Sequence, residues 1–155
     1  MKYIIALLLL VSTEQILAQK KPSLVTLSNP PSVYTPKGYS HAAVIDLGNS
    51  KMIIISGQVA YNTKSELVGA NDFEKQTEQV FTNLKNILEA HGGNMDNMVK
   101  IGVFITDTVN IPIFREVRNR YMDVKNLPPS TALVVKELFS PGLLIEVEAT
   151  AIIPK

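Results

Sequence analysis

The fold is decided by one stretch of this 155-residue chain, NDFEKQTEQVFTNLKNILEAHGG, which runs from Asn71 to Gly93. Apolar residues recur in it at three- and four-residue spacing with charged residues between them, which predicts an amphipathic helix with one buried face. The predicted buried face consists of Phe73, Val80, Phe81, Leu84, Ile87 and Leu88. Asn71 or Asp72 can cap the start of this helix by accepting a backbone N–H, and Gly92 with Gly93 can take the left-handed conformation that ends it.

Two apolar, β-branched runs precede the helix, one from Ala42 to Leu47 and one from Met52 to Ile55. The polar segment 48–51 between them is typical of a turn, so the two runs predict a β-hairpin. Because the second run is apolar without interruption, it predicts a strand that is covered on both faces.

Three strands and one further helix are predicted after Gly93. The strands cover Val99 to Ile105, Thr131 to Val135 and Leu143 to Ile153, the last two being joined by a Pro141-Gly142 turn. The helix opens at Pro112 and has Phe114, Val117, Tyr121 and Val124 on its apolar stripe. This order of elements predicts an α+β fold with both helices on one face of a mixed sheet. The other face is then left apolar, which predicts self-association.

The N-terminus is typical of a cleavable secretory signal. Lys2 supplies a positive charge, Ile4 to Val11 form an apolar run, and Ala18 is a small residue at a suitable cut site. The run is much shorter than the about 20 apolar residues of a membrane-spanning helix. We therefore expect residues 1–18 to be removed and the protein to be exported, either to a periplasm or into the medium, with no membrane attachment after cleavage.

The rest of the chain is predicted to form one domain over residues 38–155. The preceding segment, residues 19–37, is rich in Pro, Ser and Thr, with Pro30 next to Pro31. Such a composition predicts an extended arm that forms no element of its own.

The balanced charge and the absence of cysteine exclude some classes of function for this protein. The chain has 15 Lys and Arg residues, 14 Asp and Glu residues and no Cys. Disulfide and thiolate chemistry are therefore excluded, and the electrostatic footprint of a nucleic-acid partner is missing. The only histidines, His41 and His91, lack the neighbouring donors that a metal site needs, so we expect neither a metal nor a cofactor.

Four short stretches, in this order and at these spacings, resemble the RidA family, also called YjgF or endoribonuclease L-PSP. They are Ile54-Ile55-Ser56-Gly57-Gln58, Val99 to Ile105, Pro128-Pro129-Ser130-Thr131 and Pro141 to Ala149, and the resemblance covers residues 35–153. It implies a chorismate-mutase-like fold assembled as a homotrimer, with small-molecule clefts at the subunit interfaces. The active members of this family are deaminases, which hydrolyse an enamine or imine of a 2-oxo acid and release ammonia.

The resemblance also implies a set of site residues. Tyr39 matches a tyrosine that lies over the cleft, and Ser56 and Gly57 match residues that line it. Glu146 matches the glutamate associated with the attacking water, which makes it the catalytic candidate. Ser130, however, stands where active members carry the arginine that holds the substrate carboxylate. Loss of such a bidentate charged contact costs about 3 kcal/mol of binding free energy.

Three functional hypotheses follow. The first is an exported homotrimer that binds a small metabolite through these residues, with deaminase activity left open. The second is a deaminase in which Arg115, Arg118 or Arg120 of the second helix supplies the missing cation. The third is a protein-binding trimer without catalysis. A purely structural explanation also exists for one candidate, since Glu146 and Glu148 lie on one face of a strand and would suit a solvated edge.

Overall fold

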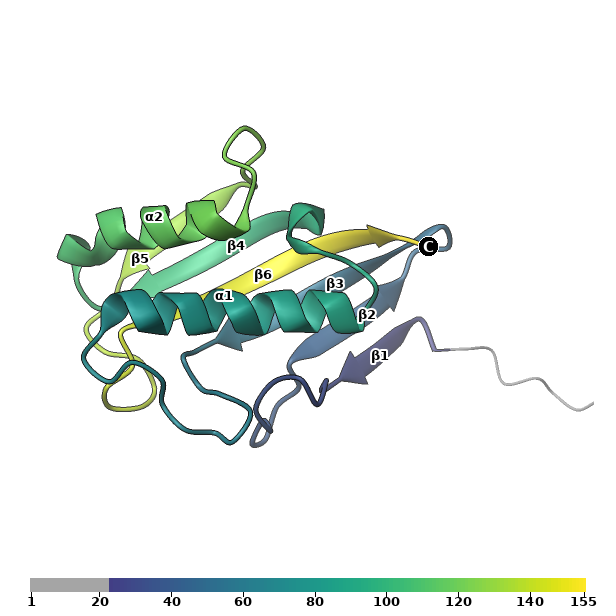
Figure 1. Cartoon of the computed structure of the whole chain (residues 1–155). Coiled ribbons are helices and arrows are strands. Elements are labelled where there is room, and N and C mark those ends of the chain that lie inside the picture. The colour runs from purple at the N-terminus through teal and green to yellow at the C-terminus, as the bar shows by residue number, and fades with distance from the viewer. Residues whose placement is uncertain (1–22) are drawn as a thin grey trace, which may run out of the picture.

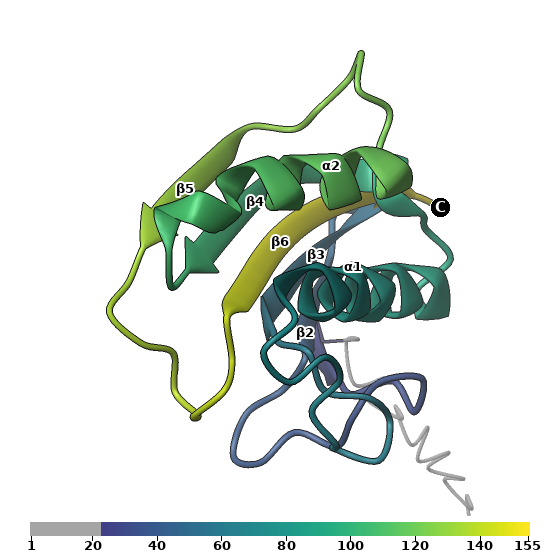
Figure 2. The ribbon, with the colours of Figure 1, turned by 60° about the vertical axis from the view of Figure 1, so that its left-hand side comes forward.

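A mixed sheet carries two helices on one of its faces (Figures 1 and 2). The computed structural model describes residues 23–155, so the predicted signal peptide and the first residues of the predicted arm lie outside the described residues. The strands are β1 (Val25–Ser28), β2 (Ala42–Asp46), β3 (Ser50–Gln58), β4 (Met98–Ile105), β5 (Ser130–Val134) and β6 (Ile145–Pro154). The helices are α1 (Phe73–Ala90) and α2 (Ile111–Tyr121), and the short 3-10 helices η1 (Met95–Asn97) and η2 (Thr108–Asn110) flank β4.

The strand order is β1-β2-β3-β6-β4-β5. Neighbouring strands are antiparallel except β4 and β5, which are parallel. The last strand of the sequence is therefore inserted between β3 and β4. The predicted α+β class, with a mixed sheet and both helices on one face, is confirmed.

Helix α1 follows its sequence pattern closely. The Asp72 side chain accepts the Lys75 N–H at 3.0 Å, and Gly92 after the helix has a φ of +75°, so both predicted end signals are used. The predicted buried face is confirmed, since all six of its residues are buried. It packs against β3 and β6 and forms the centre of the hydrophobic core.

Helix α2 ends earlier than its predicted stripe. Phe114 and Val117 are buried and Tyr121 stacks on Phe81 with ring centroids 5.3 Å apart, but Val124 is 56% exposed. The prediction for Val124 is wrong because the backbone becomes extended at Met122, whose own side chain is buried in its place.

The face of the sheet opposite the helices, the open face, mixes apolar and charged side chains. Ile53 and Ile55 of β3 are buried toward the helices, whereas Ile54 is 46% exposed on the open face. Within one chain the predicted cover on both faces of this strand is therefore wrong. Leu133 of β5 is exposed on the same face, as is Glu148 of β6, so the open face is not uniformly apolar as predicted.

The segment before Tyr39 is more ordered than its composition predicts. Residues 25–28 form β1, which pairs with the edge of β2, and Val33 and Tyr34 are buried. The prediction of an arm without an element is wrong here, because the edge of β2 offers backbone N–H and C=O groups that β1 satisfies. Among residues 23–155, no helix combines the length and apolar character needed to cross a bilayer.

Candidate functional site

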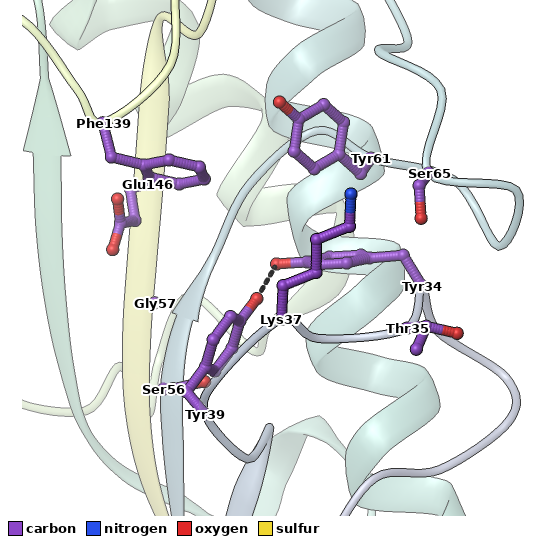
Figure 3. A pocket seen from close by; sticks show the side chains of 10 residues that line it. All are labelled: Tyr34, Thr35, Lys37, Tyr39, Ser56, Gly57, Tyr61, Ser65, Phe139 and Glu146. Atoms are coloured by element: carbon purple, nitrogen blue, oxygen red, sulfur yellow. Dashed lines mark hydrogen bonds between the residues drawn. The ribbon is translucent and has the colours of Figure 1, made fainter.

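A pocket of about 670 Å³ opens beside the end of β3, between that strand and the segment that leads into β2 (Figure 3). Tyr39, Ser56, Gly57 and Glu146, four residues of the predicted site, all line it. Its remaining lining comes from loops and consists of Tyr34, Thr35, Lys37, Tyr61, Ser65 and Phe139. Ser130, which is exposed at the start of β5, is not among these residues. The single chain therefore brings together four of the five predicted residues.

The Glu146 side chain lies over Gly57 of the neighbouring strand β3. A Cβ atom at position 57 would overlap the Glu146 carboxylate, so only glycine leaves this space free. Burial raises the pKa of Glu146, and the nearby charge of Glu148 raises it further. Glu146 thus holds a proton more readily than an exposed glutamate does, which suits a group that exchanges protons with a ligand or water.

Two tyrosine hydroxyl groups meet in the middle of the pocket. The Tyr39 hydroxyl donates to the Tyr34 hydroxyl at 3.2 Å (Figure 3). Burial, followed by the contact with Tyr39, raises the pKa of Tyr34 well above its ordinary value. Tyr34 therefore stays neutral, and its own hydroxyl proton can be donated to a ligand.

A buried histidine lies next to these tyrosines. His41 is fully buried, and its Nε2–H donates to the Tyr34 carbonyl oxygen at 2.6 Å, since a carbonyl can only accept. The Gln58 side-chain amide donates to His41 Nδ1 at 3.2 Å. Burial lowers the pKa of His41, so the ring stays neutral. The ring has a supporting role, and the Ser56 hydroxyl donates to the His41 backbone oxygen (3.3 Å) instead of to a base.

The arginines of α2 do not reach the pocket. Arg120 forms ion pairs with Glu74, Glu78 and Glu116 on the outer side of the helices. Neither Arg115 nor Arg118 lines the pocket either, so the prediction that one of these three supplies its cation is wrong within one chain.

Six lining residues were missed by sequence reasoning, namely Thr35, Ser65 and four with larger side chains. Tyr34 and Lys37 fall in the predicted arm, Tyr61 follows β3, and Phe139 lies in the loop before β6. The signal that could have found the three aromatic residues is their concentration in loops next to the matched motifs, whereas no signal distinguishes Lys37. Within residues 23–155, no three His, Asp or Glu side chains are arranged to hold a metal ion.

Residues 31–153 match the model of the family described as Endoribonuclease L-PSP. The chain belongs to this family. Protein HMF1 of Saccharomyces cerevisiae is 31% identical over 113 residues, which cover 73% of this chain and 82% of that protein. The 2-iminobutanoate/2-iminopropanoate deaminase of Dermatophagoides farinae is 27% identical over 115 residues, which cover 74% and 85%.

Solved structures agree with this assignment. The crystal structure of RidA from the Antarctic bacterium Psychrobacter sp. PAMC 21119 superposes with a TM-score of 0.69 at 29% identity, and the match covers 84% of this chain and 98% of that one. The RidA resemblance and the RidA-like fold that the sequence predicts are therefore confirmed.

Proposed function

We propose that the chain binds a small organic acid in the pocket between Tyr39 and Glu146. The observation that carries this proposal is the convergence of Tyr39, Ser56, Gly57 and Glu146 on one cavity of about 670 Å³. This volume falls within the range of about 300–1,000 Å³ that is usual for small-molecule sites. The mixture of aromatic rings with a few polar groups is also usual for such sites.

Thermal unfolding with added 2-oxobutyrate, other small carboxylates and neutral metabolites tests the binding. A carboxylate at about 100 times its Kd should stabilise the protein by about 2.7 kcal/mol, which is a readily measured shift in Tm. Neutral metabolites should shift the Tm less. Failure of every carboxylate to stabilise the protein at millimolar concentration would overturn the proposal and favour a non-catalytic, protein-binding role.

A second candidate function, hydrolysis of 2-imino acids, is favoured by the position of Glu146 in the pocket, over Gly57, together with its raised pKa. In this reaction a water oxygen bonds to the imine carbon, and the C–N bond breaks after the nitrogen has been protonated. The products are a 2-oxo acid and ammonia. Glu146 would take the proton from the water and return it to the departing nitrogen, which requires a pKa closer to neutrality than that of an exposed glutamate.

The decay of 2-iminobutyrate, generated in place by an amino-acid oxidase, tests the hydrolysis. The protein should accelerate the decay above the rate in buffer, and no acceleration would rule out this second function. Ser130→Arg should raise the rate about tenfold or more, because it restores the charged contact that active relatives have. An unchanged rate in this variant would show that position 130 does not contribute to the site.

We also propose that the protein forms a homotrimer, so that β5 of one copy lies beside the pocket of another. The exposed Ile54 and Leu133 on the open face support association, as does the exposed position of Ser130 outside its own pocket. Light scattering during gel filtration should give three times the monomer mass. A monomer mass at micromolar concentration would contradict this assembly.

Export is proposed from the sequence of residues 1–18 alone. Intact mass measurement of protein recovered from the exported fraction should show loss of these residues. Recovery of the uncleaved chain from the cytoplasm would contradict it.

A further inference from the structure

The pocket contains one positively charged and one negatively charged side chain, which lie on different sides of it. Among the ten residues that line it, Lys37 is the only base and Glu146 the only acid. Glu146 enters from the sheet, whereas Lys37 enters from the loop that leads into β2 (Figure 3). Lys37 takes part in none of the ion pairs of the described residues. Its charge is therefore not already neutralised by a carboxylate of residues 23–155.

The loop around Lys37 is anchored on both sides. Tyr34 is buried before it, Tyr39 follows it, and their hydroxyl groups are joined by the 3.2 Å hydrogen bond. Between them Pro36 restricts the backbone, and Gly38 has a φ of +80°, a conformation that glycine adopts without strain. These constraints fix the backbone of Lys37 at the edge of the pocket, while its long side chain can still adopt several conformations.

Aromatic rings surround the space next to Lys37. The rings of Tyr34 and Tyr61 meet edge to face with centroids 5.5 Å apart, and the Lys37 side chain extends toward them in Figure 3. Phe139 lies near Glu146 at another side of the pocket and is 70% exposed. Covering a large exposed aromatic ring with an apolar ligand removes much apolar surface from water, which contributes favourably to the free energy of binding.

We propose that Lys37 holds the carboxylate of the ligand, and that the rings of Tyr61 and Phe139 select an acid with an aromatic body. This inference rests on the proposed binding function and names its ligand class. Lys37 then supplies the charge that the arginine missing at position 130 would have supplied. An ammonium group is a point charge on a flexible stem, so it imposes less geometry on the carboxylate than an arginine does. A ring stacked on the tyrosines would supply the positioning that the lysine lacks.

Calorimetric titration with three matched probes tests the inference: 3-phenylpropionate, its neutral amide and propionate. The wild type should bind 3-phenylpropionate about tenfold more tightly than either of the other two. Lys37→Met keeps the apolar stem and should weaken 3-phenylpropionate binding about tenfold without changing the binding of the amide. Lys37→Arg should stay within about twofold of the wild type, since it keeps the charge.

Lys125→Met serves as the matched control, because Lys125 is exposed in the loop after α2 and lines none of the described pockets. It should bind all three probes as the wild type does. Tm values equal to that of the wild type in both methionine variants would show that neither substitution perturbs the fold.

Each part of the inference has an outcome that overturns it. Unchanged 3-phenylpropionate binding in Lys37→Met would exclude the lysine contact. Equal affinity for propionate and 3-phenylpropionate would exclude aromatic selection. If 2-oxobutyrate stabilises the protein but 3-phenylpropionate does not bind, the inferred ligand class fails and the proposed binding function stands. If no carboxylate binds, both fail.

Discussion

Glu146 and Glu148 point to the same face of β6, and each lies over a glycine of a neighbouring strand. Glu146 lies over Gly57 of β3, and Glu148 lies over Gly102 of β4, where a Cβ atom would be 2.6 Å from its Oε1. Their surroundings differ all the same. Glu148 is exposed beside a hollow of about 90 Å³, whereas Glu146 is half-buried in the pocket of about 670 Å³.

The comparison separates what the strands provide from what the loops provide. Strand geometry gives both glutamates the same orientation and places each of them over a glycine. Only at Glu146 do the loops carrying Tyr34, Tyr39 and Phe139 add walls to a pocket, and burial raises the pKa of this glutamate. A carboxylate on this strand thus becomes a candidate for catalysis because loops cover one end of β6.

The largest expected difference between the two glutamates is in imine hydrolysis. Glu146→Gln should lower the rate about 100-fold, because the amide cannot accept the proton of the attacking water. Glu148→Gln should stay within about twofold of the wild type, because Glu148 does not line the pocket and makes the smaller of the two contributions to the raised pKa of Glu146. Initial rates of 2-iminobutyrate decay measure both variants. Similar losses in the two would show that loop burial does not distinguish them.

A smaller difference is expected between the two glycines. Gly57→Ala should weaken 3-phenylpropionate binding about tenfold and lower stability by about 1–3 kcal/mol, because half-buried Glu146 has little room to move aside. Gly102→Ala should leave binding unchanged and cost less than about 1 kcal/mol, because exposed Glu148 can rotate into solvent. Titration calorimetry and urea unfolding give the two quantities. Equal binding losses would refute the assigned role of Gly57.

The smallest expected difference is in the pH dependence of stability. Because the pKa of Glu146 is raised in the folded state, the wild type should lose stability as pH rises through the carboxyl range. Glu146→Gln lacks this loss, so its Tm should exceed that of the wild type by up to about 3 °C at pH 7 and match it at pH 3. Thermal unfolding from pH 3 to 8 tests this. His41, whose pKa is lowered by burial, contributes equally to both proteins.

A Tm difference that grows toward acid would contradict the assigned direction. Glu148→Gln provides the control. Removal of the Glu148 charge should reduce the pKa shift of Glu146, and this variant should therefore lose less stability than the wild type as pH rises. The two variants together therefore separate the effect of burial from the effect of the neighbouring charge.

Helix α1 and strand β6 could be predicted because each has a periodic pattern. Residues 71–93 carry the spacing, the cap and the terminating glycine of α1 in one continuous stretch. Alternation along β6 likewise predicts that Glu146 and Glu148 share the face opposite Ile145 and Val147. These signals are local, so no knowledge of the remaining chain is needed to interpret them.

The loop half of the site could not be predicted in this way. Tyr34 is buried against Val59 and Leu143, and nothing periodic near it indicates those distant partners. Lys37 is exposed and differs from other lysines only by its place at the pocket. The position of Ser130 outside the pocket follows from the pairing of β5 at the edge of the sheet, which depends on strand order.

The insertion of β6 between β3 and β4 also has a consequence for biosynthesis. The strand that joins the two halves of the sheet is the last of the described strands to leave the ribosome. Until then β3 and β4 have no common partner, and the apolar residues that α1 buries against β6 stay uncovered. The core cannot be completed before β6, which ends at Pro154, has been synthesised, so the chain stays incompletely folded until then. This delay would suit the unfolded passage across a membrane that the proposed export requires.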